Sequence, residues 1–486
     1  MRLVKTTYTR GERPTLQTQC SSVQLHFQEL GPRKVSADFN GGTLTSDAGA
    51  LLLRHVDLAK RYLQDFATCF RDERDPRYVE HSLPQLLRQR VLALCLGYED
   101  LNDHDRLRHD PLFATACGVL DPTGSGRKYA RDRGKPLAGK STLNRLETTP
   151  PGRIRPRSKK IIYDPQAIES YFVQKFLQSR RTAPRRLILD LDCTDTILHG
   201  HQQGRFFHGY YDCYCYLPLY VFCGTDLLVA CLRPSNIDPS EGALEEIQRL
   251  VQQIRKKWPR VRILIRGDSG FCREAIMSWC EQHGVDYLFG LARNSRLHRR
   301  ISKELTQARE AFQHTLQPQR VYKDFRYRTR HSWSRWRRVI GKAEYLAKGE
   351  NPRFVVTSLP LEFIGAQALY EQLYCARGEM ENRIKEQQLY LFASRTSSAT
   401  MRANQLRLWF SALAYLILNE LRKVGLRGTQ FVRAQCDTIR LKLLKIGALV
   451  SVSVRRVHVR LASGYPYQET FQKILANLQR SLPVLC

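Results

Sequence analysis

The spacing of hydrophobic and polar positions changes along the chain and predicts segments of different kinds. Residues 47–118 show helical spacing interrupted by polar breaks, and the leucine-rich stretch 83–94 is typical of a packed helix. The first helix follows a turn at 40–42 and is predicted to be capped by Ser46 or Asp47. Beyond residue 160, short apolar strands alternate with helices, which predicts an α/β core with a mixed sheet.

The predicted core begins with three strands that read as an antiparallel meander. These strands cover residues 187–192, 211–221 and 227–232. A helix, a strand, a second helix and a strand follow, at residues 242–256, 261–266, 273–283 and 286–292. Residues 404–421 form a helix that is apolar nearly all round and too short to span a bilayer, so we place it in the core. An alternating strand at 449–461 and a helix at 467–482 close the chain.

The first core strand carries two acids on one face. Leu187, Leu189 and Leu191 point one way, whereas Ile188, Asp190 and Asp192 point the other. So apolar a strand is expected at the centre of a sheet, buried on both faces. A carboxylate there is costly to bury unless a positive group pairs with it, and an arginine or a divalent metal are the candidates. The alternative is a strand end that runs into a polar turn.

Two further acids follow later in the chain, Asp268 just after a strand and Glu381 on a helix face. Asp268 comes just after strand 261–266, and a glycine on either side lets the backbone bend closely around it. In the helix predicted at 364–391, Tyr374, Arg377, Glu381 and Lys385 fall within a sector of about 80°. One helix face thus carries a phenol, a guanidinium, a carboxylate and an ammonium. The alternative is a solvent-exposed face with ordinary ion pairs such as Glu381 with Lys385.

Charge narrows the class of partner. The 486 residues include 78 Lys and Arg against 46 Asp and Glu, a formal net charge of +32. Such an excess predicts a polyanionic partner, and nucleic acid is the first candidate. A membrane is not expected, because no run of about 18 apolar residues occurs and the N-terminus lacks the apolar core of a signal peptide. The 14 cysteines include no C-x-x-C pair and are expected to be reduced cytoplasmic thiols.

Two further stretches bear on nucleic-acid binding. Residues 322–339 interleave arginines with aromatics including Trp333 and Trp336, a mixture that can grip phosphates and stack on an unpaired base. The alternative is a solvated hairpin whose aromatics pack on the core. Residues 134–141 match the spelling of a phosphate-binding loop, but no buried strand precedes them. We interpret them as a helix start capped by Ser141 that presents Lys140 and Arg145 to DNA phosphates, followed by a basic linker at 151–160.

Three motifs in order carry a resemblance: Asp192-Cys-Thr, Arg266-Gly-Asp268-Ser-Gly-Phe and Tyr374-x-x-Arg377-x-x-x-Glu381. The chain resembles bacterial insertion-sequence transposases with an RNase H-like DDE core and a Y-R-E-K signature, in particular insertion-sequence family thirteen-eighty. That family's D-x-T pattern favours Asp192 over Asp190 as the first acid. The signature lysine would fall at Gln388, and Lys385, one turn after Glu381, is the candidate substitute.

The resemblance implies a site and a reaction. Asp192, Asp268 and Glu381 would be catalytic and hold two Mg²⁺ ions, for which Mn²⁺ would substitute. Tyr374, Arg377 and Lys385 would hold DNA phosphates, and Trp333 or Trp336 would stack on a flipped base. Water would cleave DNA at the transposon end, and the freed 3′-hydroxyl would then attack target DNA.

The expected architecture is an α/β fold: an RNase H-like mixed-sheet catalytic core with a β-rich insertion, preceded by a helical DNA-binding domain. Residues 1–160 would bind DNA, 161–294 and 361–425 would form the core, 295–360 the insertion, and 426–486 a C-terminal region. Expected partners are double-stranded DNA, as terminal inverted repeats and target, and a second copy in a homodimer or higher oligomer. The expected location is the cytoplasm, on the nucleoid. The alternatives are an RNase H-like nuclease without strand transfer and a catalytically inactive DNA-binding protein.

Overall fold

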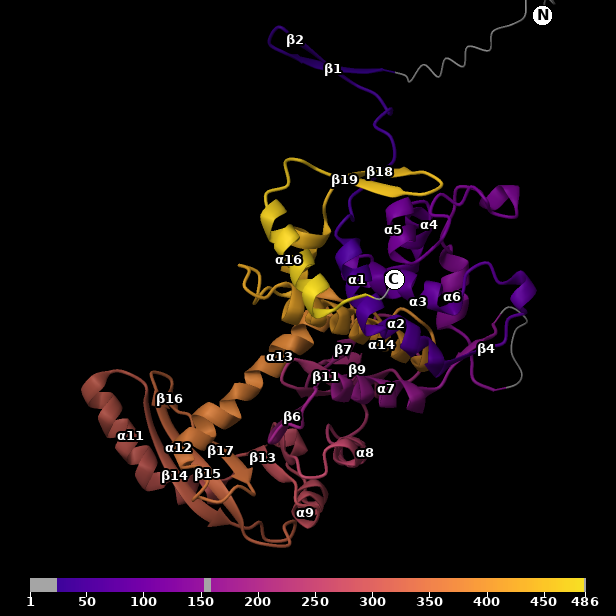
Figure 1. Ribbon diagram of the computed structural model, residues 1–486. Coiled ribbons are helices and arrows are strands. Elements are labelled where there is room, and N and C mark those ends of the chain that lie inside the picture. The colour runs from indigo at the N-terminus through magenta and orange to yellow at the C-terminus, as the bar shows by residue number, and fades with distance from the viewer. Residues whose placement is uncertain (1–23, 153–158, 485–486) are drawn as a thin grey trace, which may run out of the picture.

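The computed structural model describes residues 24–152 and 159–484, which form a sheet-based lobe and a mainly helical lobe (Figure 1). Within these residues the first lobe is built on a nine-stranded mixed sheet in the order β11-β10-β6-β12-β13-β17-β15-β14, with β16 paired to β15. Its strands are β6 (Arg186–Cys193), β10 (Leu219–Cys223), β11 (Asp226–Cys231), β12 (Arg262–Gly267), β13 (Asp286–Leu291), β14 (Gln319–Tyr327), β15 (Arg337–Leu346), β16 (Gly349–Glu350) and β17 (Arg353–Thr357).

Strand β6 lies at the centre of the RNase H-like part of this sheet, as predicted. It pairs antiparallel with β10, which pairs antiparallel with β11, and it pairs parallel with β12, which pairs parallel with β13. Helices α8 (Ala243–Lys257) and α9 (Glu274–Gln282) connect β11 to β12 and β12 to β13. An antiparallel meander joined to parallel strands through one central strand is the RNase H-like arrangement, so the predicted fold class is confirmed.

Helices cover both faces of β6. On one face, Leu187, Leu189 and Leu191 share a core with α7 (Pro165–Gln178), α8 and α9. On the other face, Leu369 and Tyr370 pack against neighbouring strands. Because both faces of β6 are buried, a polar side chain from this strand can reach the surface of the core only at the end of the strand.

Residues 295–360 begin with helices and then extend the same sheet. Helices α10 (Ser295–Arg300) and α11 (Ser302–Thr315) were not predicted. Leu305 and Ala308 of α11 are buried, and α11 packs on β14 and β15. The predicted strands follow, and β17 pairs antiparallel with β13. These strands therefore continue the central sheet across a shared edge.

The helix predicted over 364–391 is not regular. It consists of α12 (Ala366–Ala368), a π-type turn η6 (Leu369–Tyr374), a 3₁₀ turn η7 (Cys375–Arg377), α13 (Gly378–Lys385) and a second π-type turn η8 (Glu386–Tyr390). Wide and tight turns rotate side chains away from a spacing of 3.6 residues per turn. The predicted 80° sector is therefore wrong in detail. This helical stretch runs between the two lobes in Figure 1.

The N-terminal and C-terminal segments share the core of the helical lobe. Leu92 of α3, Phe410 of α14 and Leu478 of α16 belong to the same buried cluster. The helices of this lobe are α1 (Ala50–Lys60), α2 (Tyr62–Phe66), α3 (Leu83–Leu96), α4 (His104–Leu107), α5 (Pro111–Ala116), α6 (Lys140–Glu147), α14 (Met401–Glu420), α15 (Cys436–Ile439) and α16 (Gln468–Ser481). The 404–421 helix is buried, as predicted.

Both predicted helix caps are wrong. The N-cap of α1 is Gly49 and that of α6 is Gly139, and neither helix has a side-chain cap. Asp47 instead accepts hydrogen bonds from Lys445 at 2.6 Å and from the Tyr98 hydroxyl at 2.7 Å. Its carboxylate therefore ties the N-terminal segment to the C-terminal one.

Two predicted strands are each broken in two. Residues 211–221 divide into β9 (Cys213–Tyr216) and β10 around Pro218, which has no N–H to donate. Residues 449–461 form a hairpin of β18 (Ala448–Val452) and β19 (Val457–Leu461). The remaining strands are β1 (Leu25–Leu30), β2 (Arg33–Ala37), β3 (Leu44–Thr45), β4 (Phe70–Asp72), β5 (Ile161–Tyr163), β7 (Thr196–Ile197) and β8 (Phe206–His208).

Two expectations concern the linker and the membrane. Most of the predicted linker at 151–160 lies outside the described residues. In the part of the chain that the structure describes, no helix is both long enough and apolar enough to cross a bilayer.

Candidate active site

The two acids on β6 have different surroundings. Asp190 is 4% exposed and accepts two hydrogen bonds from Arg266 on β12, at 2.5 and 2.8 Å. The two residues lie directly opposite each other in the parallel pair, and Arg266 also donates to the backbone carbonyl of Leu373. An arginine or a divalent metal was expected to pair with a buried carboxylate, and for Asp190 the partner is an arginine. This pair leaves Asp192 as the free acid at the end of β6.

Asp192 lies in a buried environment with other acids nearby. Burial raises the pKa of the Asp192 carboxyl to about 7; the Arg377 guanidinium opposes that rise, and the Asp268 and Glu381 carboxylates add to it. A carboxyl with so high a pKa is short of positive charge. The four groups are therefore close enough to influence one another, although they come from two strand ends and one helical stretch.

Asp268 follows β12 and begins a single 3₁₀ turn, η5 (Ser269–Phe271). Its Oδ1 accepts a hydrogen bond from the Gly270 N–H at 2.8 Å, which fixes the carboxylate at the turn. The turn packs closely on β13: a Cβ at Gly290 would lie 2.9 Å from the Ser269 nitrogen and 2.6 Å from the Tyr374 Oη. A side chain at position 290 would therefore displace the backbone of the acid turn, the Tyr374 ring, or both.

Arg377 is the common neighbour of the three acids. Its Nη2 donates to Glu381 Oε1 at 3.0 Å. Burial lowers the pKa of Arg377, but the charges of Asp192, Tyr374, Glu381 and Asp268 outweigh burial and raise it. In this arrangement the arginine supplies the positive charge that the acids require.

Glu381 hydrogen-bonds Arg377, whereas Asp192 and Asp268 act on its guanidinium through charge, and the three acids do not close on one point. Among residues 24–152 and 159–484, no group of three or more His, Cys, Asp or Glu side chains is close enough to hold a metal ion. The donor set nevertheless fits hard divalent cations, because it offers carboxylate oxygens and one acid with a strongly raised pKa. The Glu381 carboxylate would become free to bind a cation if its contact with Arg377 changed.

The other two residues predicted on this helix face, Tyr374 and Lys385, differ in how far they are buried. Tyr374 is largely buried with its hydroxyl near Gly290, whereas Lys385 is exposed and makes no hydrogen bond or ion pair with any described residue. Gln388, at the expected signature-lysine position, donates to the backbone carbonyl of Asp195 at 3.0 Å. Gln388 therefore contacts the loop after β6.

The two tryptophans of the basic hairpin, residues 322–339, also differ in how far they are exposed. Trp333 is 5% exposed, belongs to the sheet core and packs edge-on against Tyr327, so in this structure it has no free face for a base. Trp336 is 48% exposed. The prediction that either ring would stack on DNA is therefore restricted to Trp336.

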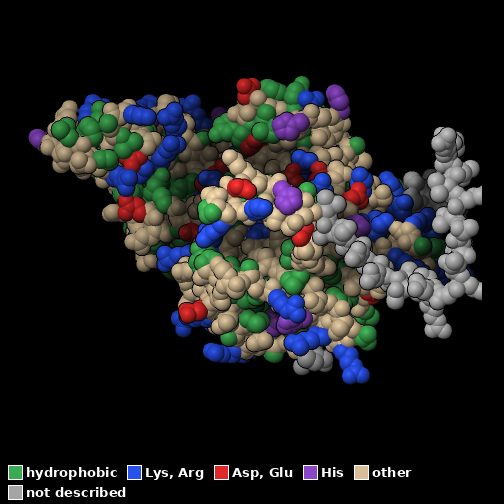
Figure 2. All heavy atoms as spheres, turned by 90° about the horizontal axis from the view of Figure 1, so that it is seen from above, with side chains coloured by type: hydrophobic (Ala, Val, Ile, Leu, Met, Phe, Trp, Pro, Cys, Tyr) green, Lys and Arg blue, Asp and Glu red, His purple; other side chains and the backbone are tan. Residues whose placement is uncertain are grey.

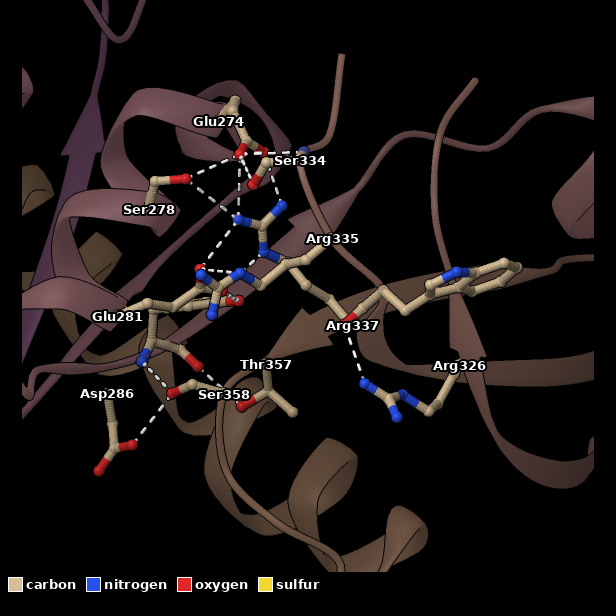
Figure 3. A network of polar contacts seen from close by, with 12 residues as sticks. Glu274, Ser278, Glu281, Asp286, Arg326, Ser334, Arg335, Arg337, Thr357 and Ser358 are labelled. Carbon is tan, nitrogen blue, oxygen red and sulfur yellow. Dashed lines mark hydrogen bonds and ion pairs between the residues drawn. The ribbon is translucent and has the colours of Figure 1, made fainter. Parts of the chain in front are cut away.

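A polar network fixes the turn end of this hairpin (Figure 3). Arg337 is 3% exposed and donates to Glu274 at 2.6 Å and to Glu281 at 2.7 Å, both on α9. Ser334 donates its hydroxyl to Glu274 at 2.6 Å. The network ties the hairpin turn to the helix that follows the Asp268 turn.

Sequence reasoning missed several residues that shape the site. Arg266 was part of a quoted motif, but its pairing with Asp190 depends on strand register, which periodicity does not reveal. Gly290 is one of many glycines, and no local pattern marks it. Gln388 was noted as a departure from a signature, and its bond to the β6 loop was not foreseen.

Comparison with known proteins assigns the chain to a family. The solved structure of a piggyBac transposase synaptic complex with hairpin DNA is similar over 82% of this chain and 80% of that chain, at 12% sequence identity and a TM-score of 0.39. A search of curated proteins gives no match. The family described as Transposase DDE domain group 1 matches residues 27–483, and the chain belongs to it. The predicted DDE transposase function is thereby confirmed.

Proposed function

We propose that the chain mobilises an insertion sequence of family thirteen-eighty. It binds the terminal inverted repeats, cleaves the DNA at the ends and joins the 3′ ends to target DNA. It acts in the cytoplasm on the nucleoid, as a homodimer or higher oligomer. The observation that supports the proposal is the mutual electrostatic influence of Asp192, Asp268, Glu381 and Arg377, which come from two strand ends and one helical stretch, together with burial that raises the pKa of the Asp192 carboxyl to about 7.

We propose Asp192, Asp268 and Glu381 as the catalytic acids and as the ligands of Mg²⁺ or Mn²⁺. When bound, such ions activate the attacking oxygen and stabilise the leaving oxygen of the phosphodiester. Asp190 is excluded from this role because Arg266 already occupies both of its oxygens. The hydrogen bond from Gly270 holds the Asp268 carboxylate at the strand end, and Arg377 donates a hydrogen bond to Glu381 four positions further along the same helical stretch.

Arg377 and Tyr374 are proposed to receive the DNA phosphate beside the acids. A guanidinium that leaves Glu381 has a second anion available in the phosphate, and arginine suits phosphate through its planar fork. Lys385 is free to contact a phosphate further along the strand, and Trp336 offers an exposed ring to a base. Lys140, which bonds Asp105 at 3.2 Å and is half exposed, and Arg145 are candidates for backbone contacts.

Affinity for DNA is spread over many basic side chains. Figure 2 shows Lys and Arg side chains distributed over the whole visible face, with no single patch that contains most of them. Phosphate contacts of this kind position a protein on DNA and make binding sensitive to salt. Loss of one catalytic acid is therefore expected to leave binding nearly intact.

The test uses purified full-length protein, labelled terminal-repeat DNA and Mg²⁺ or Mn²⁺ without nucleotide. Asp268→Asn and Glu381→Gln keep side-chain size and should each abolish cleavage and strand transfer, because a metal site fails when a charged ligand is removed. Glu379→Gln is the matched control: Glu379 is on the same helix, and its side chain is 75% exposed. It should retain wild-type cleavage.

The outcomes separate the proposal from its alternatives. Near wild-type cleavage by Asp268→Asn would refute the assignment of that acid. Cleavage without joined product identifies a nuclease that lacks strand transfer. Specific binding of the terminal repeats with no cleavage under either metal identifies an inactive DNA-binding protein.

A further inference from the structure

A cavity lies at the opposite end of the core from the acids. Its volume is about 860 Å³, and it is lined where β6, β12 and β13 begin and where the chain leaves β17. Because these three strands run parallel, their other ends carry Asp192 and Asp268. From Arg186 to Asp192, at about 3.3 Å per residue, the separation is roughly 20 Å.

Four arginines and one lysine line this cavity: Arg185, Arg186, Arg260, Arg262 and Lys257. No side chain of the four arginines makes a hydrogen bond or ion pair with any residue in the described ranges. The one carboxylate among the described lining residues is Asp286, which already accepts a hydrogen bond from the Ser358 hydroxyl at 3.0 Å (Figure 3). The cavity therefore has an excess of positive charge.

Burial and the charges of Arg262 and Arg266 lower the pKa of the Arg186 guanidinium, and the Asp286 carboxylate opposes that change. Arg186 and Arg262 are direct partners in the parallel register of β6 and β12. Like charges placed opposite each other destabilise a sheet. In addition, Nη2 of Arg186 is buried without a hydrogen-bond acceptor. Elsewhere in the core, buried arginines such as Arg266 and Arg337 have carboxylate partners.

The floor of the cavity is apolar and partly aromatic. Pro184, Trp258, Leu359 and Phe363 contribute to it, and the Phe363 side chain is 50% exposed. The Arg186 guanidinium lies 5.2 Å from the centre of the Phe363 ring. Exposed aromatic rings beside guanidinium groups are the combination that binds unpaired nucleotides, with the phosphate on the arginines and the base on the ring.

We propose that this cavity is a second nucleic-acid site that binds single-stranded DNA. A duplex keeps its bases stacked inside and cannot place one on Phe363, whereas a single strand presents phosphates and free bases together. The inference rests on the proposed function in one respect, that the chain works on DNA. A strand held here lies roughly 20 Å from the acids and is therefore not the segment being cut.

The experiment measures binding of a fluorescent oligothymidylate of about 10 nucleotides by the full chain. The double variant Arg185→Ala/Arg260→Ala should weaken binding at least tenfold. Arg433→Ala/Arg455→Ala is the matched control, since it removes two exposed arginines that have no side-chain partner among the described residues; it should weaken binding less than threefold. Phe363→Ala, which changes no charge, should weaken binding about fivefold or more and leave duplex binding unchanged.

Each outcome decides the proposal. Equal losses in the two double variants would mean that only overall charge matters and would overturn it. A second pair of results would also overturn the proposal: polyglutamate displaces the bound oligonucleotide, and Phe363→Ala does not weaken oligonucleotide binding. Together these results would indicate that the cavity binds an acidic protein partner. Cleavage of terminal-repeat duplex is measured on the same proteins and should stay within twofold of wild type. Failure of wild-type cleavage would contradict the proposed function and leave the single-strand result intact.

Discussion

At the scale of single residues, Asp190 and Asp192 differ in their surroundings although they share a strand face. Asp190 is paired with Arg266 inside the sheet, whereas Asp192 faces other acids at the strand end. Asp190→Asn should lower the free energy of unfolding by about 3–5 kcal/mol, because it leaves a buried guanidinium without its partner. Asp192→Asn should be no less stable than wild type without metal and should lose cleavage. Chemical denaturation and the cleavage assay test both.

Asp226→Asn provides a control, since that acid pairs with the more exposed Lys423 and Arg180 and its loss should cost less stability than that of Asp190. An Asp190→Asn protein as stable as wild type would contradict the structural role of the Arg266 pair. An Asp192→Asn protein that cleaves at the wild-type rate would contradict the assignment of the first acid.

The two tryptophans of the hairpin give the second prediction. Trp333→Ala should destabilise the fold by about 3–5 kcal/mol, because the ring is buried in the sheet core. Trp336→Ala should leave stability unchanged and weaken DNA binding by about 1–3 kcal/mol if one base stacks on the ring. Thermal unfolding and DNA titration distinguish the two effects. A stable Trp333→Ala protein that binds DNA poorly would reverse the assignment.

The sequence marks the candidate acids as unusual, but it does not reveal their partners. A lone carboxylate at an apolar strand end is costly, so the pattern itself marks Asp192 and Asp268 as unusual. The choice between arginine and metal for Asp190 depends on which residue lies opposite it in the neighbouring strand. That residue, Arg266, is 76 positions away in the chain. Likewise, Trp333 and Trp336 have the same local composition, and only tertiary packing separates them.

At the scale of elements, strands and crossover helices could be predicted because burial imposes a simple period on them. The helical stretch at 366–390 could not, because its π-type and 3₁₀ turns preserve an apolar pattern close to that of a regular helix. Such turns occur frequently at functional sites, where they re-aim side chains. Here Arg377 ends the 3₁₀ turn, and the two π-type turns lie before Arg377 and after Glu381. The position of the two side chains follows from these turns rather than from a 3.6-residue period.

The network between α9 and the basic hairpin predicts an acid-sensitive contact. Burial raises the pKa of Glu274, but hydrogen bonds from Arg337, Ser334 and Ser278 outweigh burial and lower it to about 2 from an ordinary 4.5. Since the folded-state pKa lies below the unfolded one, this carboxylate stabilises the fold above about pH 4.5, and the contribution is lost as pH falls towards 2.

Glu274→Gln should therefore cost stability at neutral pH, about 1–2 kcal/mol after allowance for the 28% exposure of the Glu274 side chain. The difference from wild type should shrink between pH 5 and pH 3 in thermal unfolding scans. Glu310→Gln, at an exposed position on α11, is the control and should show no such trend. A difference that stays constant across this pH range would contradict the account of the network.

At the scale of the whole molecule, the prediction of a separate N-terminal domain did not anticipate how the chain closes on itself. Asp47 bonds Lys445, β3 pairs with β18, and Glu147 is bound by both Arg90 and Arg407. All of these contacts except that of Arg90 with Glu147 join residues that are hundreds of positions apart in the chain, and local periodicity does not report contacts of that range. The helical lobe is consequently built from both ends of the chain around α14.

This shared core predicts that a cut at residue 160 yields fragments that do not fold alone. A 161–486 fragment would expose the surface of α14 that packs on the N-terminal helices, including Phe410, whose ring contacts Phe66 of α2, and would leave Arg407 and Lys445 without their carboxylate partners. Large exposed apolar patches of this kind lead to aggregation. The fragment should be insoluble or lack a cooperative unfolding transition, and co-expression with a 1–160 fragment should restore a soluble complex. Size-exclusion chromatography and circular dichroism measure both outcomes. A monodisperse 161–486 fragment that unfolds cooperatively would show that the sheet-based lobe and the C-terminal region are stable without the N-terminal helices.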